Sequence, residues 1–372
     1  MTALNLLLKP ASGSCNLRCR YCFYVDAAEK RETACYGLMT EETAESIISK
    51  SFATATATCH FGFQGGEPML RGLAFYEKFI ALCEGHNASH IQTTYSIQTN
   101  GTLIDDQWAR FFRRHHFLVG VSLDGDKTLH DLNRVDAEGK GSFDRVLQAL
   151  WLLEKYDVEY NILTVVTSQT VRNIERIYHF YKKNNLRYQQ YIPCLDPLGE
   201  SRGDRDYSLT PDGYGNFLCR LFDLWYHDYI KGEPISNRYF ENLAAILYGL
   251  PPESCGMSGI CNPQITVEAD GSVYPCDFYM LDAYRLGNFR QGTFADFDDQ
   301  LAKSGFVMES KQGLGSCKQC RYLSLCRGGC RRDRQAKDLH VLGENYFCSA
   351  YKQFYKYAVP RLLQLVRQKA DA

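Results

Sequence analysis

The sequence has no excess of charge of either sign. It contains 42 Lys and Arg residues against 43 Asp and Glu residues, which gives a formal net charge of -1. Proteins that bind nucleic acid mainly by neutralising phosphates need a strongly basic surface, so this class is disfavoured. The sequence also lacks an apolar run close to the roughly 20 residues that cross a bilayer, which excludes a membrane-spanning helix.

A targeting segment is missing as well. The first ten residues hold a short apolar patch, without a basic region before it or a small-residue cleavage site after it. We therefore expect a cytoplasmic protein. In a reducing compartment, clustered cysteines are more often metal ligands or redox groups than disulfides.

Cysteine is what the sequence has in abundance, with 16 among 372 residues. A chain of this length can bury a sizeable core, so the cysteines are not needed as covalent staples. Three lie close together near the N-terminus, and eight lie in the last third of the chain. Five others are single, and we expect them to be small and mostly buried apolar residues: Cys35, Cys59, Cys83, Cys194 and Cys219.

From residue 4 to residue 192, short apolar runs alternate with helical patterns. The predicted strands cover residues 4–9, 60–64, 94–99, 117–122, 161–167 and 188–192, and the predicted helices between them cover 41–52, 73–84, 105–116, 143–156 and 171–184. This alternation indicates an α/β fold with a parallel sheet. Six strands suit a partial (β/α)6 barrel, and a doubly wound sheet is the alternative. Thr40, Asp105 and Ser142 are predicted helix caps.

Polar and glycine-rich segments follow the carboxyl ends of several predicted strands, as in Gln64-Gly-Gly-Glu67-Pro. Ligand sites of βα folds lie at that edge, so these loops should meet at one mouth. Beyond residue 250 the chain becomes richer in Cys, Gly and Arg, and its elements become shorter. We therefore predict two domains, 1–250 and 251–372.

The N-terminal cysteines have the spacing Cys15-x3-Cys19-x2-Cys22. Three thiolates can hold three irons of a [4Fe-4S] cube and leave the fourth iron open to a cofactor. A zinc knuckle with a distant fourth ligand such as Cys59 or His60 is the alternative. The motif, with an aromatic residue before its third Cys, resembles the signature of radical S-adenosylmethionine (SAM) enzymes. The segment 65–68, Gly-Gly-Glu-Pro, resembles the SAM-binding GGE motif of that superfamily.

The C-terminal cysteines match the pattern of a SPASM domain. Asp270-Gly271 predicts a hairpin turn between two short strands in this region. Eight thiolates suffice for two fully ligated [4Fe-4S] clusters, while zinc ribbons fit the Cys-x2-Cys spacing equally well. By resemblance, one cluster is held by Cys255, Cys261, Cys276 and Cys330, and an outer one by Cys317, Cys320, Cys326 and Cys348.

Motifs along the whole chain resemble anaerobic sulfatase-maturating enzymes, in segments 63–68, 98–105, 121–125, 133–134, 274–279 and 326–332. The resemblance implies a radical SAM barrel followed by a SPASM domain. It implies oxidation of a Cys, or a Ser, within a sulfatase Cys/Ser-x-Pro/Ala-x-Arg motif to Cα-formylglycine. The cofactors would be SAM and three [4Fe-4S] clusters: a 5′-deoxyadenosyl radical removes a Cβ hydrogen, and the auxiliary clusters accept an electron. The partners would be a nascent or unfolded sulfatase and a small electron donor such as ferredoxin or flavodoxin.

The same resemblance assigns roles to single residues. Asp277 would be the base, and the SAM contacts would be Tyr21, Gly66, Ser122, Arg134 and Leu195. Tyr24 and Gln64 are expected at the same mouth. The arginines at 331, 332 and 334 are expected on the solvated surface, or at an electron-donor contact. A SPASM-type peptide maturase forming thioether or carbon–carbon links, and a zinc-ribbon interaction protein, are the alternative functions.

Overall fold

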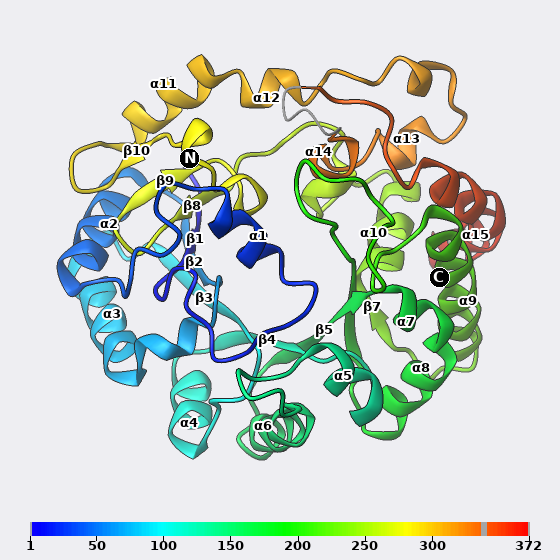
Figure 1. Cartoon of the computed structure of the whole chain (residues 1–372), viewed down its shortest axis with the longest axis horizontal. Coiled ribbons are helices and arrows are strands. Elements are labelled where there is room, and N and C mark those ends of the chain that lie inside the picture. The colour runs from blue at the N-terminus through cyan, green and yellow to red at the C-terminus, as the bar shows by residue number, and fades with distance from the viewer. Residues whose placement is uncertain (1, 336–340, 371–372) are drawn as a thin grey trace. The chain divides into compact units, whose positions relative to one another are not determined.

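A computed structural model describes residues 2–335 and 341–370 (Figure 1). The chain forms two compact units, each built from several segments. The first comprises Met1–Ser122, Asp131–Tyr160 and Pro263–Phe306, and the second comprises Leu123–His130, Asn161–Asn262 and Val307–Ala372. The division of the chain near residue 250 stays a prediction about domain organisation.

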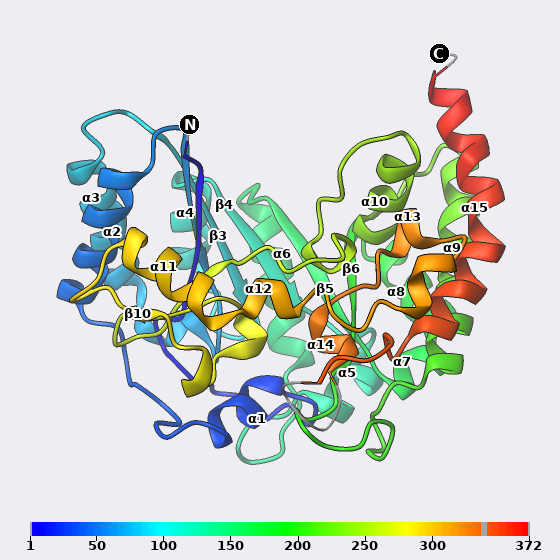
Figure 2. The ribbon, with the colours of Figure 1, turned by 90° about the horizontal axis from the view of Figure 1, so that it is seen from above.

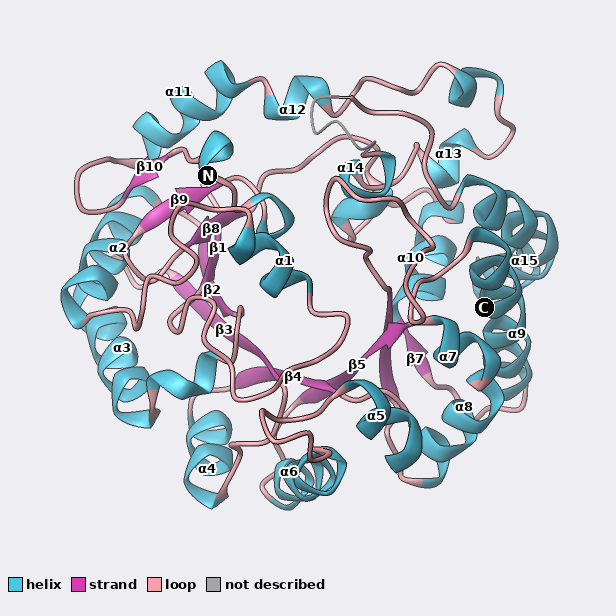
Figure 3. Cartoon of the chain, viewed as in Figure 1, coloured by secondary structure: helices cyan, strands magenta, loops and turns pink. Residues whose placement is uncertain are grey.

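The first unit contains parallel strands that follow one another in sequence order (Figure 3). They are β1 (Leu4–Leu8), β2 (Thr58–Phe63), β3 (Gln92–Thr99) and β4 (Phe117–Ser122), each hydrogen-bonded to the next. A doubly wound sheet reverses its strand order at one point. The consecutive order therefore fits the barrel alternative.

A hairpin from the last third of the chain extends this sheet beyond β1. Strand β8 (Ile265–Val267) runs parallel to β1, and β9 (Ser272–Tyr274) returns antiparallel to β8, with the short β10 (Gly287–Asn288) beyond it. Gly271 makes the turn with φ +89°, which glycine adopts without strain. The predicted hairpin is confirmed, and its register places residues 265–267 beside the N-terminal strand.

Helices α2, α3, α4 and α6 lie along one side of the strands of the first unit, and α1 lies on the other side (Figure 1). The helices and 3-10 turns of this unit are α1 (Phe23–Glu29), α2 (Glu41–Thr54), η1 (Pro68–Arg71), α3 (Leu73–His86), α4 (Asp106–Arg114), α6 (Phe143–Lys155), η3 (Asp277–Tyr279), η4 (Asp282–Tyr284) and α11 (Phe294–Ser304). Two further helices, α5 (Lys127–Asn133) and α12 (Phe306–Glu309), contain residues of both units.

The predicted caps are confirmed at two helices and wrong at a third. The side chains of Thr40 and Asp105 accept the backbone N–H groups of the residues three positions on. Ser142 precedes α6 but makes no side-chain cap, because its hydroxyl donates to the backbone carbonyl of Arg134 at 2.9 Å instead. A carbonyl eight residues earlier has taken the place of the local helix N–H as the hydroxyl's partner.

The second unit contains the parallel strands β5, β6 and β7 with helices packed along them. Helices α9 and α15 lie side by side in both views of the ribbon (Figures 1 and 2). The elements are β5 (Tyr160–Val166), α7 (Ser168–Arg172), α8 (Ile174–Lys183), β6 (Tyr188–Pro193), α9 (Pro211–Ile230), β7 (Ser236–Asn237), α10 (Arg238–Leu247), η2 (Cys255–Met257), η5 (Ser316–Gln319), α13 (Leu323–Cys326), α14 (Arg331–Arg334) and α15 (Cys348–Ala370). The helix predicted over 171–184 is two helices, interrupted at Asn173.

Each unit buries its own aromatic core. In the first, Phe63 packs edge-on against Phe79 with ring centroids 5.1 Å apart. In the second, Phe222 packs against Phe240 at 5.3 Å. Within residues 2–335 and 341–370, no helix is long and apolar enough to cross a membrane.

Candidate active site

The loop after β1 carries the three N-terminal cysteines. All three thiols are half-buried, and Cys22 directly precedes α1. The sulfur of Cys15 accepts the backbone N–H of Leu17 at 3.4 Å and the side-chain amide of Asn100 at 3.8 Å. Burial raises the pKa of the Cys15 thiol, while these donors favour its thiolate, the form that binds iron. The loop therefore fits a cluster ligand set.

Among the residues that the structure describes, no group of three or more Cys, His, Asp or Glu side chains is arranged to hold a single metal ion. A [4Fe-4S] cube binds each thiolate through a different iron, so its ligands do not converge on one point.

Glu67 of the Gly-Gly-Glu-Pro segment ties neighbouring loops together. Its carboxylate is fully buried and accepts three hydrogen bonds, from the hydroxyl of Thr99 at 2.8 Å and the backbone N–H groups of Asn100 at 2.8 Å and Met69 at 3.1 Å. Its own backbone N–H donates to the carbonyl of Ser14 at 2.7 Å. Burial raises the pKa of Glu67 to about 7. This residue therefore fixes the β2 and β3 loops against the cysteine loop.

The two glycines before Glu67 are required by close neighbours. Both have positive φ, +95° at Gly65 and +51° at Gly66. A Cβ on Gly66 would lie 2.1 Å from the carbonyl oxygen of Ser14, and one on Gly65 would lie 2.1 Å from Cε of Lys9. Without a Cβ, the Gly66 backbone is also accessible to a ligand.

Asp277 lies at the centre of a hydrogen-bonded cluster. It begins the turn η3 directly after Cys276 and is 8% exposed. One carboxylate oxygen accepts from the hydroxyl of Tyr24 at 2.6 Å and from the amide of Gln64 at 3.3 Å. The other faces the ammonium of Lys9 at 3.2 Å. The predicted neighbours Tyr24 and Gln64 are therefore both present.

Lys9 was not predicted. Its sequence signal was a lysine at the end of an apolar strand, which is common at the surface, yet here it is 3% exposed. Its ammonium also lies 3.8 Å from the ring centroid of Tyr24. Burial, followed by the charge of Asp277, raises the pKa of Tyr24 well above its usual value. The phenol is therefore a hydrogen-bond donor to the carboxylate.

Four of the predicted SAM contacts lie in the first unit. Tyr21 and Arg134 are buried, and the guanidinium of Arg134 lies 5.4 Å from the ring centroid of Tyr21. Ser122, at the end of β4, accepts from the amide of Gln98 at 3.3 Å. Gly66 is half-buried and has no Cβ to cover its backbone. Leu195, the fifth, is half-buried in the second unit.

A buried acceptor beside Arg134 supports a ligand at this place. The side-chain oxygen of Asn133 is buried and receives no hydrogen bond from any residue that the structure describes. Such an unsatisfied acceptor is costly unless a ligand or water supplies the donor. The residues around it therefore fit a polar cofactor such as SAM.

The predicted outer cluster cysteines line one cavity of the second unit. The cavity is lined by Cys317, Cys320, Cys326 and Cys348, among other residues. Burial raises the pKa of the Cys326 thiol, and the neighbouring thiolates of Cys317 and Cys320 add to the effect. Four thiols around one cavity are a suitable ligand set for a closed cluster.

The other predicted set is divided between the two units. Cys276 belongs to the first unit, while Cys255, Cys261 and Cys330 belong to the second. Within the second unit, Cys330 precedes α14 and its sulfur accepts the backbone N–H of Arg332 at 3.4 Å. A Cβ on Gly256, next to Cys255, would lie 3.8 Å from Cβ of Cys330. The second unit thus brings Cys330 close to the Cys255 segment.

The prediction of surface arginines is wrong. The side chain of Arg331 is 1% exposed and pairs with Glu309 at 2.8 Å. Buried Arg332 donates to the carbonyl of Asp196 at 2.6 Å. Arg334, also buried, donates to backbone carbonyls of residues 310 and 312. Guanidinium groups donate to carbonyls of irregular loops, which have no hydrogen-bond partner within a helix or strand. Because these three arginines are buried in that role, they cannot also face an electron donor.

The single cysteines divide by burial. Cys59, Cys83 and Cys194 are buried, as predicted. Cys219 is half-buried, and Cys35 is exposed. The prediction of a buried apolar role is therefore wrong for Cys35, whose thiol lies 3.4 Å from the hydroxyl of Ser14.

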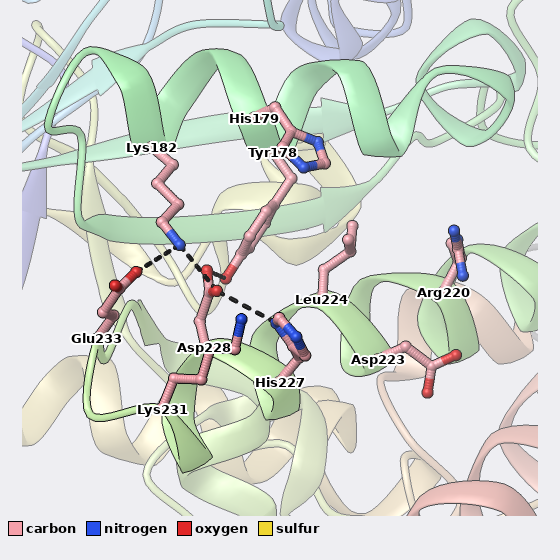
Figure 4. A pocket seen from close by; sticks show the side chains of 10 residues that line it. All are labelled: Tyr178, His179, Lys182, Arg220, Asp223, Leu224, His227, Asp228, Lys231 and Glu233. Atoms are coloured by element: carbon pink, nitrogen blue, oxygen red, sulfur yellow. Dashed lines mark hydrogen bonds and ion pairs between the residues drawn. The ribbon is translucent and has the colours of Figure 1, made fainter.

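A charged pocket of the second unit lies between α8 and α9 (Figure 4). The ammonium of Lys182 bridges Asp228 at 2.8 Å and Glu233 at 2.7 Å, and the hydroxyl of Tyr178 donates to Asp228 at 3.0 Å. These groups satisfy one another. We interpret the pocket as an ion-pair network that joins the two helices.

The family comparisons match the motifs found above. The radical SAM superfamily matches residues 10–181, and an iron-sulfur cluster-binding domain, SPASM, matches residues 259–321. A cysteine-type anaerobic sulfatase-maturating enzyme of Clostridium novyi (strain NT) is 44% identical over 370 residues, which cover 100% of this chain and 99% of the relative. A serine-type anaerobic sulfatase-maturating enzyme of Bacteroides thetaiotaomicron is 31% identical over 390 residues, which cover 99% and 94%.

A solved structure agrees over the same length. Native anSMEcpe with bound AdoMet and Cp18Cys peptide matches with a TM-score of 0.94 and 45% identity, covering 99% of each chain. The predicted α/β radical SAM fold with a C-terminal SPASM domain is confirmed, and the zinc-protein alternatives are set aside. Full-length identity of this degree shows that the chain belongs to the anaerobic sulfatase-maturating enzymes of the radical SAM superfamily.

Proposed function

We propose that this enzyme oxidises a cysteine in a sulfatase Cys-x-Pro-x-Arg segment to Cα-formylglycine. The observation that carries the proposal is the buried Asp277 carboxylate, held by Lys9, Tyr24 and Gln64 directly after Cys276, a proposed cluster ligand. Higher identity to the cysteine-type relative than to the serine-type relative, 44% against 31%, supports a cysteine target.

The cofactors in this proposal are SAM and three [4Fe-4S] clusters, and the residues present fit them. Cys15, Cys19 and Cys22 would hold the cluster that binds SAM. The eight C-terminal cysteines named above would hold the two auxiliary clusters. Together these groups supply hydrogen-atom abstraction and electron transfer when bound.

The protein's own residues bind and orient SAM in this proposal. Arg134 would hold the methionine carboxylate through a charge-assisted pair, since its guanidinium is buried beside Tyr21. The Gly66 backbone, which has no Cβ over it, and the Ser122 hydroxyl are suited to further polar groups of SAM. Leu195 would contribute apolar or backbone contact.

Asp277 is the proposed base, which takes the proton of the substrate thiol. Three donors already fix both oxygens of its carboxylate, so it is oriented before the substrate arrives. Pre-positioning of this kind is what general-base catalysis requires. Tyr24 and Gln64 border the same place and would contact the peptide.

The proposed reductant is a small acidic protein such as ferredoxin or flavodoxin. Since Arg331, Arg332 and Arg334 are buried, its contact must lie elsewhere. Exposed Lys318 and Lys352 are the alternative, because both follow closely on cysteines of the outer cavity. Opposite charge would steer an acidic donor to this surface. We also retain the cytoplasm as the proposed location, where a reducing environment keeps cysteines free.

The test is anaerobic incubation of the reconstituted enzyme with SAM, dithionite and a Cys-x-Pro-x-Arg peptide, read by mass spectrometry. Conversion of the Cys peptide to formylglycine is expected, with much less from the matched Ser peptide and none from an Ala peptide. SAM cleavage without formylglycine from either peptide would contradict the proposal. A thioether or carbon–carbon link in the product would favour a peptide maturase instead.

A further inference from the structure

We infer that Lys9 is a positioning residue for Asp277, which it holds in the orientation that accepts the substrate proton. The inference deepens the proposed function and rests on it. It concerns a residue at the end of β1, far from Asp277 in sequence, which no motif of the chain singles out.

The contacts of the Lys9 ammonium carry the inference. It lies 3.2 Å from Oδ1 of Asp277 and 3.1 Å from the sulfur of Met280, and it lies over the ring of Tyr24. The side chains of the ion pair are 4% and 11% exposed. A lysine is rarely buried to this degree unless it is paired. The pair thus has a specific orientation with little water around it.

The carboxylate of Asp277 is held from two sides. Lys9 occupies Oδ1, while Tyr24 and Gln64 donate to Oδ2. Removal of Lys9 would leave only the Oδ2 contacts, about which the carboxylate can rotate. A base displaced by about 1 Å can lose a factor of roughly 100 in rate.

The backbone places Lys9 as firmly as its side chain does. The Lys9 N–H donates to the carbonyl of Val267 on β8 at 2.8 Å, so the residue is bonded to the same hairpin segment that leads to Asp277. Gly65 leaves room for the aliphatic stem, because a Cβ there would lie 2.1 Å from Cε of Lys9. The first glycine of the motif therefore makes space for this lysine.

A purely structural ion pair is the competing explanation, and the chain offers a matched control for it. Arg31, which follows α1, forms another buried pair with Glu268 of the same hairpin, with side chains 4% and 0% exposed and a distance of 2.7 Å. Arg31→Met breaks a pair of similar burial without contacting Asp277. Lys140→Met, at an exposed pair with Glu138, controls for the substitution itself.

The experiment compares the reconstituted variants Lys9→Met, Asp277→Asn and the double variant, using a peptide deuterated at Cβ of the target Cys. Deuterium transfer to 5′-deoxyadenosine reports hydrogen abstraction, and formylglycine per 5′-deoxyadenosine reports the later proton and electron steps. For Lys9→Met we expect near-normal deuterium transfer and peptide KM, with the product ratio lowered roughly 10- to 100-fold. Lys9→Arg, which keeps the charge, is expected to recover part of the ratio.

The double variant should be no worse than Asp277→Asn, since residues that act as a unit are not additive. Thermal unfolding of the same proteins gives a readout besides activity: the midpoint loss of the double variant should be smaller than the sum of the single losses. Arg31→Met should lower the midpoint without lowering the product ratio.

A product ratio for Lys9→Met within about twofold of the wild type overturns the inference, because the ratio reports the function lost at the later steps. So does an equal loss in Arg31→Met, which would make the effect structural. If Lys9→Met loses its iron, the Lys9→Arg variant is measured in its place. A normal iron content in Lys9→Arg, with no recovery of the product ratio, also overturns the inference. Absence of formylglycine from the wild type would instead refute the proposed function, and the inference with it.

Discussion

The buried charge of Glu67 gives a quantitative prediction about pH and stability. Glu67 is fully buried, and burial raises its pKa from 4.5 to about 7 in the folded chain. A carboxyl group whose pKa is raised in the folded state contributes its full stabilisation at pH values below the pKa of the unfolded state, near 4.5. That contribution to the free energy of unfolding is lost as the pH rises toward 7. Glu67→Gln, which resembles the protonated acid in shape, should remove this dependence.

The size of the effect follows from the two pKa values. With 4.5 in the unfolded state and about 7 in the folded state, charging Glu67 costs about 3 kcal/mol at high pH. Between pH 5.5 and 8.5 the wild type should lose about 2 kcal/mol of stability relative to Glu67→Gln, because part of the titration lies below this window. This loss of stability with rising pH is opposite to the behaviour of an ordinary salt-bridged carboxylate, which stabilises the fold more as the pH rises.

Denaturant unfolding of the anaerobic, cluster-loaded proteins at several pH values measures this difference. The free energy of unfolding of the wild type minus that of Glu67→Gln should fall steadily from pH 5.5 to about 7.5 and then level off. Parallel pH profiles would refute the reasoning. They would show that the three hydrogen bonds from Thr99, Asn100 and Met69 offset the cost of burial.

Three further predictions concern the site. Asp277→Asn should keep SAM cleavage but lower formylglycine yield roughly 100-fold or more, measured by mass spectrometry; near-normal yield would remove Asp277 as the base. Gly66→Ala should abolish SAM binding in equilibrium dialysis because its Cβ would lie 2.1 Å from a carbonyl oxygen, whereas Gly37→Ala, with φ +75° and open space, should bind normally. Cys320→Ala should lose about four of roughly twelve irons in an iron assay, whereas Cys219→Ala should lose none.

Much of this fold could be read from local sequence. Strand β4 was predicted over residues 117–122, where it is found, because a short apolar run between polar turns needs no distant information. The hairpin at Gly271 was equally local, since Asp-Gly sets its own turn. The cysteine spacings and the Gly-Gly-Glu-Pro segment led to the family, which the full-length identity then showed.

Other features depended on contacts that the sequence does not display. The hydroxyl of Ser142 bonds the carbonyl of Arg134 rather than its own helix, and the predicted helix 171–184 breaks at Asn173. Arginines that read as surface charge are buried, because loops around them leave carbonyls to satisfy. Helix and strand propensities describe one segment by itself. They therefore do not predict when a partner elsewhere in the chain replaces a local hydrogen bond.

The candidate base shows the same division most clearly. The sequence by itself determined that Asp277 follows Cys276, a predicted cluster ligand, and it predicted Tyr24 and Gln64 at the same mouth as the SAM contacts. Only the tertiary structure decided that Lys9 would hold the other carboxylate oxygen, 268 positions away along the chain. The reason is that β1 pairs with β8, and this pairing between the two ends of the sequence brings a buried cation to a buried anion.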